Sequence, residues 1–202
     1  MKVLYKEDYF EMKNKDNAID FIFTKANQIM TEEGRIFSHL LIDGIEVYEN
    51  HETYINEHAN EIMIIEIVTK KMADIIIDIS YSILEYLERA IPSIEELVNN
   101  SYESFSHDTW NGINELGEGM QFILQFATLT RTSNLKPKNW DKIDVNINQC
   151  ESAFKQLLDA IESKDTVFIS DILSYEIIPA YQALIGDLSS FIQSKEFNKY
   201  VN

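Results

Sequence analysis

The last quarter of the chain carries apolar residues at almost every third or fourth position, in two runs. One run covers residues 140–161 and the other covers 169–191, with the polar segment 163–166 between them. Apolar residues at this spacing line one side of a helix, and that side must be buried against another element. The pattern predicts an antiparallel helical hairpin at the end of the chain. Pro179 is expected to bend its second helix or to end it early.

The same helical spacing fills the middle of the chain. A stripe over residues 72–98 predicts a helix that is kinked or broken near Pro92. A further stripe over 110–127 predicts another helix, and residues 131–139 form the clearest loop. Long helical segments joined by short connections favour an up-down-up-down four-helix bundle.

The first third of the chain mixes helical and strand-like patterns. Two β-prone runs flank Asp43-Gly44, a pair that tolerates the positive φ angles of a type I′ hairpin turn. Asp16 and Asn50 are placed to cap one helix each, and Gly34 is placed to end the first of them. The expected order is helix, strand, strand, helix and strand, at 17–33, 35–42, 45–48, 51–60 and 62–69.

The two patterns meet at Lys70-Lys71. We therefore expect a small α+β unit with a three-stranded sheet at 1–70 and a helical bundle at 71–202. The fold class is mostly α. For residues 1–15 the pattern leaves a short strand, a turn and a frayed end all open.

The net charge of the chain limits which classes of molecule are expected to bind it. The chain has 202 residues and a net charge of -17, with 34 acidic and 17 basic side chains. Such a chain repels phosphate backbones and anionic membrane surfaces, so we expect neither nucleic acid nor a membrane as a partner. A charged protein partner is expected to be basic. The alternative is that the acidic residues only solvate the surface.

The cysteine content favours a reducing compartment. Cys150 is the single cysteine, and the chain shows no secretory leader and no apolar segment long enough to span a bilayer. We therefore expect a cytoplasmic protein. Because Cys150 lies on the apolar stripe of 140–161, we expect a small buried hydrophobe rather than a nucleophile.

The common catalytic and metal-binding motifs considered next do not occur in the sequence. It contains no Glu-x-x-His, His-Glu-x-x-His, Cys-x-x-Cys or Gly-x-Ser-x-Gly. His51 and His58 could lie on one helix face, but two turns separate them by about 10 Å, which is too far for one zinc ion without further ligands. The simpler interpretation is a short helix with a polar face that turns Tyr54 and Ile55 inward. We assign no catalytic, cofactor-binding or metal-binding residue and expect no cofactor.

Two other features have plain structural interpretations. The glycine-rich segment 112–119 lacks the lysine of a phosphate loop and carries Glu115 and Glu118, which would repel phosphate. It favours a helix with small residues where a neighbour packs closely, or a local kink. Adjacent carboxylates such as Glu95-Glu96 point in different directions on a helix, so adjacency alone builds no acid–base pair.

An acidic zone with an aromatic turn is the strongest candidate for an interaction surface. Between residues 85 and 118 the only lysine or arginine is Arg89, and aromatic side chains gather at 102–110. Aromatic residues amid charge can anchor a protein interface. The alternative is that the rings fold over the end of the bundle and seal it. The candidate protein-binding residues are Glu95, Glu96, Tyr102, Glu103, Phe105 and Trp110.

Residues 157–179 form an amphipathic helical turn that ends in Tyr175-Glu176-Ile177-Ile178-Pro179. This segment resembles a C-terminal segment of small uncharacterised proteins of low-GC Gram-positive bacteria, a family of unknown function. The resemblance implies no activity and no functional residues.

Two functions are open on these grounds. The first is a non-enzymatic helical adaptor or chaperone-like module that binds another protein, with a homo-oligomer also possible. The alternative is an enzyme or a small-molecule sensor with a pocket between the α+β unit and the bundle. In that case His39 and His107 are the residues of interest.

Overall fold

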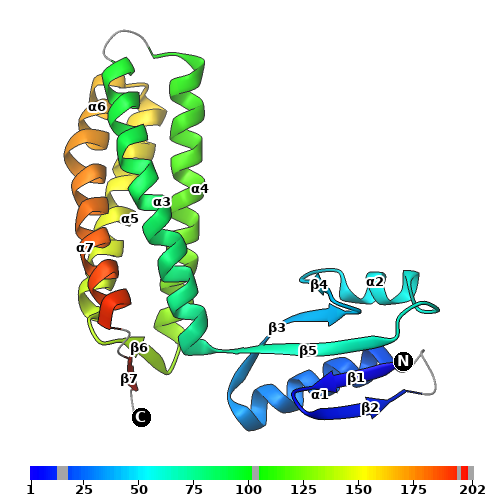
Figure 1. Cartoon of the computed structure of the whole chain (residues 1–202). Helices are drawn as coiled ribbons and strands as arrows, with labels where there is room; N and C mark the ends of the chain where they lie inside the picture. Colours follow the sequence, from blue (N-terminus) through cyan, green and yellow to red (C-terminus); the bar gives the residue numbers. More distant parts are fainter. Residues whose placement is uncertain (13–17, 102–104, 195–196, 200–202) are drawn as a thin grey trace. The chain divides into compact units, whose positions relative to one another are not determined.

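The computed structural model describes residues 1–12, 18–101, 105–194 and 197–199. The chain divides into two compact units, Met1–Ile75 and Ile76–Asn202. The first, here the sheet unit, contains a five-stranded sheet. The second, here the helical unit, consists mainly of long helices, so the chain as a whole is mostly α (Figure 1).

The sheet unit has more strands than the sequence pattern indicates. Its five strands are arranged in the order β2-β1-β5-β3-β4, and β1 pairs parallel with β5 while the other pairs are antiparallel. The expected three-stranded sheet is therefore wrong. The two additional strands are only four residues long, which is too short for a period of two to stand out in the sequence. The strands are β1 (Lys2–Tyr5), β2 (Asp8–Glu11), β3 (Arg35–Ile42), β4 (Ile45–Val47) and β5 (Ile64–Lys71).

The hairpin between β3 and β4 forms as predicted. Asp43 and Gly44 both have positive φ, at 48° and 88°. The Asp43 carboxylate also accepts hydrogen bonds from the backbone N–H groups of Met63 and Ile64, at 3.0 and 2.8 Å. The turn is therefore tied to the start of β5 as well as joining its own two strands.

Two helices share the apolar core of the sheet unit. The buried side chains of α1 (Ala18–Glu33) and α2 (His51–Glu57) lie in one cluster with the buried side chains of the strands. Helix α2 is shorter than the expected 51–60. Asn50 precedes it in the left-handed region, at φ 51°, and its side chain makes no capping hydrogen bond. Asp16, the expected cap of α1, lies outside the described residues.

A surface contact joins the end of α1 to the turn after β1. The Glu33 carboxylate accepts hydrogen bonds from Lys6 Nζ at 2.5 Å and from the Tyr5 hydroxyl at 2.9 Å. The hydrogen bond from Lys6 and that from Tyr5 hold the pKa of Glu33 below its ordinary value.

This lowered pKa predicts a pH dependence of stability. Because the folded-state pKa of Glu33 lies below the unfolded one, the contact stabilises the sheet unit at neutral pH, and that stabilisation is lost as pH falls through the folded pKa. Glu33→Gln should therefore reduce the loss of stability of the sheet unit between about pH 5 and pH 3. Urea unfolding followed by circular dichroism measures this. Tryptophan fluorescence is the internal control, because Trp110 and Trp140 both belong to the helical unit. If the variant lost as much stability on acidification as the unchanged protein, Glu33 would not be the source of this pH dependence.

The helical unit ends in the predicted helical hairpin. Helix α5 (Trp140–Ser163) ends at Lys164, which has φ 57°, and Asp165 caps the next helix by accepting a hydrogen bond from the Phe168 N–H at 3.0 Å. The returning arm packs against α5 and runs beside α3 (Met72–Ser101) and α4 (His107–Thr132) (Figure 1). It comprises α6 (Thr166–Ile172), the π-helical turn η1 (Leu173–Ile177) and α7 (Ile178–Ser194).

Pro92 does not break α3. The helix continues from Met72 to Ser101 with the proline inside it. Pro92 is exposed, while Leu87 and Ile94 on either side are fully buried. The carbonyl that loses its donor at Pro92 is therefore on the solvent side, where water can replace the hydrogen bond, and the buried stripe on both sides keeps the helix intact.

Pro179 is accommodated by a π-turn, so it does not end the last helix early. Immediately before it, the Ile178 N–H donates to the carbonyl of Leu173, five residues back. Such a turn widens the helix by one residue, and α7 then continues to Ser194. The proline has no N–H to donate to the carbonyls of Ser174 or Tyr175.

The expected loop at 131–139 contains a short strand. β6 (Leu135–Pro137) pairs antiparallel with β7 (Phe197–Lys199). Strands of three residues are too short to show a hydrophobic period, and the partner strand lies about sixty positions away along the chain. Local sequence therefore gives no signal for this pairing.

The glycines of α4 confirm the prediction of close packing between helices. A Cβ atom at Gly119 would collide with the ring and hydroxyl of Tyr86, and one at Gly112 would collide with Leu97. Both neighbours belong to α3. At Gly117 a Cβ atom would meet nothing within 4 Å. Two of these glycines therefore allow α3 side chains to approach α4 closely, whereas the third does not serve that purpose.

Candidate functional site

The structure describes part of the acidic aromatic turn. Phe105 and Trp110 are both half-buried at the start of α4, with ring centroids 5.0 Å apart. Glu95 and Glu96 are exposed on α3. Tyr102 and Glu103 lie outside the described residues. The use of this surface as an interface stays a prediction.

Ser106 fixes the start of α4 beside these rings. Its side chain accepts a hydrogen bond from the Thr109 N–H, and the Thr109 hydroxyl accepts one from the Ser106 N–H. This reciprocal capping satisfies donors that a helix start otherwise leaves free. The Phe105–Trp110 pair is thereby held on a defined helix end.

A groove of about 720 Å³ runs between α4 and α5. Its walls are mainly apolar, and Leu158 on its rim is 58% exposed. Trp110 stands one helical turn before Asn114 and two before Gly117, so it lies on the face of α4 that lines the groove. The residues that line the groove are Ile113, Asn114, Gly117, Glu118, Met120, Gln121, Leu124, Glu151, Phe154, Lys155, Leu157, Leu158 and Ile161.

The charges on the groove are mostly acidic. Glu118 lies on the α4 side, and on the α5 side Glu151 is paired with Lys155 at 2.7 Å. None of the described residues forms an ion pair with Glu118. The groove therefore combines an apolar floor with an uncompensated negative charge on its rim.

Further apolar side chains are exposed where the chain leaves α5. Val167 and Phe168 at the start of α6 are 66% and 45% exposed. Figure 1 places α6 at the same end of the helical unit as the start of α4. Sequence reasoning missed this surface because Leu157 and Ile161 also read as core residues. The adjacent Leu158, which widens the apolar stripe of α5, is the signal that could have indicated it.

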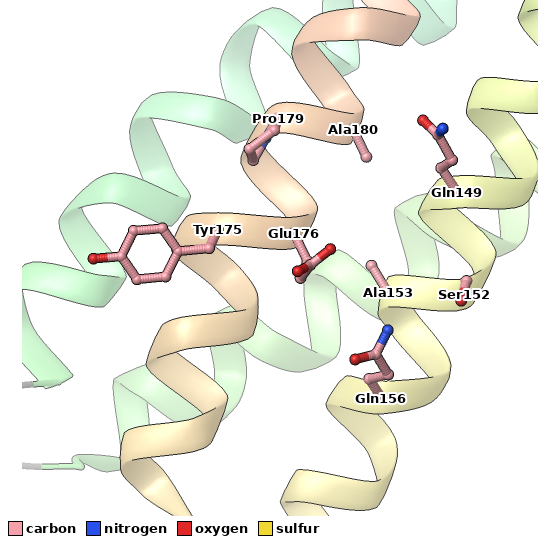
Figure 2. A pocket seen from close by; sticks show the side chains of 8 residues that line it. All are labelled: Gln149, Ser152, Ala153, Gln156, Tyr175, Glu176, Pro179 and Ala180. Atoms are coloured by element: carbon pink, nitrogen blue, oxygen red, sulfur yellow. The ribbon is translucent and has the colours of Figure 1, made fainter.

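A second hollow, of about 360 Å³, lies on another face of α5, against the π-turn. Figure 2 shows Gln149, Ser152, Ala153 and Gln156 on the α5 side, and Tyr175, Glu176, Pro179 and Ala180 on the other. The Glu176 side chain points toward α5, whereas the Tyr175 ring projects away from it. This hollow contains the Tyr-Glu-x-x-Pro ending that carries the sequence resemblance.

The histidines of the sheet unit lie among aromatic rings. His39 is buried, with Nδ1 3.0 Å from the Ser38 hydroxyl and its ring 4.6 Å from that of Tyr48. His51 packs edge-on against Phe23 and Phe37. His107, in the helical unit, is exposed as the first residue of α4.

His58 lies just after α2 and stacks on Tyr54, with ring centroids 4.5 Å apart. Within the described ranges no three His, Cys, Asp or Glu side chains gather in a way that could hold a metal ion. The expected pocket between the two predicted domains stays a prediction.

Cys150 is fully buried on α5, as predicted. Burial raises the pKa of its thiol to about 12, so almost none of it is thiolate at neutral pH. We expect the native protein to resist a disulfide reagent such as DTNB at pH 8 and to react fully once urea unfolds the helical unit. Absorbance of the released thiolate measures both rates. Rapid labelling without denaturant would contradict the burial of Cys150.

Comparison with known proteins gives a family but no activity. A family model described as a domain of unknown function matches residues 78–186, just over half of the chain. Both the groove and the hollow lie within this range. No curated protein and no solved structure matches the chain. Within the described residues, no helix has the length and apolar character required to cross a membrane.

Proposed function

The chain belongs to the family DUF8042, a domain of unknown function, and we propose that it is a non-enzymatic, cytoplasmic module that binds another protein. In this proposal α3, α4, α5 and the arm formed by α6, η1 and α7 make an up-down-up-down four-helix bundle. The groove between α4 and α5 receives the apolar face of a basic amphipathic helix from the partner.

The groove is the observation that carries the proposal. At about 720 Å³ it has room for several side chains, and apolar side chains line most of it. An amphipathic helix docks in such a groove by inserting residues spaced three or four positions apart. Leu158, Val167 and Phe168 add exposed apolar surface that a partner would remove from water.

The charge of the chain argues for a basic occupant. The unpaired Glu118 lies on the rim, and no lysine or arginine occurs between residues 90 and 130. Lysines on the polar face of a bound helix would lie near this negative charge. Such complementary charges speed association and favour basic partners over acidic ones. A second copy of this chain is a poorer occupant, because two chains of net charge -17 repel each other.

The aromatic turn extends the same surface. Trp110 continues the groove-lining face of α4, and Glu95, Glu96 and Phe105 belong to the acidic zone before it. Tyr102 and Glu103 complete the set proposed to contact the partner. A partner helix longer than the groove would then meet aromatic rings and carboxylates beyond its end.

Calorimetric titration with synthetic amphipathic helices tests the proposal. One peptide carries leucines on one face and lysines elsewhere, and its counterpart carries glutamates in place of the lysines. We expect the lysine peptide to bind at least roughly ten-fold more tightly. Leu158→Gln should weaken that binding roughly ten-fold, because it removes an apolar contact without adding charge.

Val145→Gln is the matched control. Val145 lies on the same helix and is 54% exposed, against 58% for Leu158, but it does not line the groove. Its substitution should leave peptide binding unchanged. Equal binding of the two peptides, or equal losses in the two variants, would refute the proposed groove.

A further inference from the structure

The hollow beside the π-turn is rich in hydrogen-bond acceptors and poor in cations. Glu176 is the single charged side chain in its lining. Residues 166–194 contain no lysine, arginine or histidine. Among the described residues nothing forms a hydrogen bond or ion pair with the Glu176 carboxylate. This carboxylate is therefore uncompensated within its own fold.

The neighbouring groups on α5 reinforce this character. The side chains of Gln149, Ser152 and Gln156 line the opposite wall, and none of them is engaged with another described residue. Each offers an oxygen that can accept a hydrogen bond. Three polar side chains without a hydrogen-bond partner among the described residues therefore line the hollow together with the Glu176 carboxylate.

The π-turn forms the wall of the hollow that lies opposite α5. Pro179 lines the hollow and has no N–H, so the carbonyls of Ser174 and Tyr175 receive no hydrogen bond from that position. A π-turn departs from regular helix geometry and is often found at functional sites. The departure lies at the residues that line this hollow.

We propose that the hollow binds a primary ammonium or guanidinium group. Such a group carries several N–H donors and one positive charge, which match a carboxylate that shares the hollow with amide and hydroxyl oxygens. At about 360 Å³ the hollow admits the end of an alkyl chain with its cationic head. The group can come from a free small amine or from a lysine or arginine side chain of another protein.

The site is separate from the groove between α4 and α5. Gln149, Ser152 and Gln156 occupy one face of α5, whereas Glu151, Leu158 and Ile161 occupy the opposite face. The inference therefore does not rest on the proposed function. Loss of binding at one site leaves the other intact.

Titration followed by NMR of the backbone amides tests this site. Agmatine, which carries both a guanidinium and an ammonium group, is the free probe. A blocked Gly-Arg-Gly peptide is the protein-like probe, and its citrulline counterpart lacks the charge. We expect agmatine or the arginine peptide to shift the amide signals of Tyr175, Glu176 and Gln156, and the citrulline peptide to leave them unchanged. Binding of agmatine assigns the site to a free amine, and binding of the arginine peptide alone assigns it to a partner side chain.

Two variants locate the binding. Glu176→Gln keeps the shape of an exposed side chain and removes its charge, so it should weaken the binding roughly ten-fold. Asp171→Asn is the matched control, because it removes the same charge from the same arm outside the hollow. Absence of shifts with both charged probes would overturn the proposal, and so would equal losses in the two variants.

Discussion

Replacing Gly119 by alanine is expected to lower the free energy of unfolding of the helical unit by about 3 kcal/mol. The added Cβ atom would overlap the ring and hydroxyl of Tyr86, which are held between helices. A rigid aromatic side chain can move away only if the two helices separate or the ring leaves its rotamer. Urea unfolding followed by tryptophan fluorescence measures the effect on this unit.

Gly117→Ala is the matched control on the same helix. No atom lies within 4 Å of its future Cβ. Alanine there should raise the free energy of unfolding by about 0.5–1 kcal/mol, because glycine is the poorer helix former. In a protein that already carries Tyr86→Ala, Gly119→Ala should lower the free energy of unfolding much less, because the ring that the new Cβ atom would overlap is absent. Additive effects of the two substitutions would show that the contact with Tyr86 is not the cause.

Tyr181→Ala is expected to lower the free energy of unfolding of the helical unit by about 3–5 kcal/mol. Tyr181 is the largest of the fully buried side chains in the described residues, and its ring lies against those of Tyr86 and Phe154. Truncation would leave a cavity where α3, α5 and α7 meet. Urea unfolding followed by tryptophan fluorescence measures this loss as well.

Tyr181→Phe separates the ring from its hydroxyl. Burial raises the pKa of Tyr181, and its hydroxyl, like that of Tyr86, is buried without a partner of hydrogen-bonding geometry among the described residues. An unsatisfied buried hydroxyl contributes nothing favourable, so phenylalanine should be neutral or stabilising by about 1 kcal/mol. A clear loss of stability would instead indicate that the two hydroxyls share a hydrogen bond in solution.

The elements that could be predicted from the sequence are those that depend on residues close together along the chain. Asp43-Gly44 specifies a hairpin because few residue pairs tolerate two positive φ angles. The stripes of α5 and of the returning arm specify a helical hairpin because each has one apolar side to bury. The glycines at 112 and 119 indicated close packing, although the partners Leu97 and Tyr86 could not be named from the sequence.

Features that depend on distant residues escaped prediction. The pairing of β1 with β5 and that of β6 with β7 each join segments about sixty positions apart along the chain. The effect of Pro92 depends on which side of α3 faces water, and that of Pro179 depends on a π-turn that has no sequence rule. The groove and the hollow arise between helices, so single-helix periodicity could not reveal either one. In the sequence, the apolar residues that line the groove resemble core residues, and the polar residues that line the hollow resemble ordinary surface residues.

The parallel pairing of β1 with β5 has a consequence for the order of folding. Lys2 pairs with Ile64, so the chain must close a loop of some sixty residues before this part of the sheet exists. The helical hairpin, in contrast, closes through a few residues around Lys164. Folding rates fall as the sequence separation of contacting residues grows. β1 is synthesised well before β5, so during synthesis the edge of β1 that pairs with β5 stays unpaired until β5 has emerged.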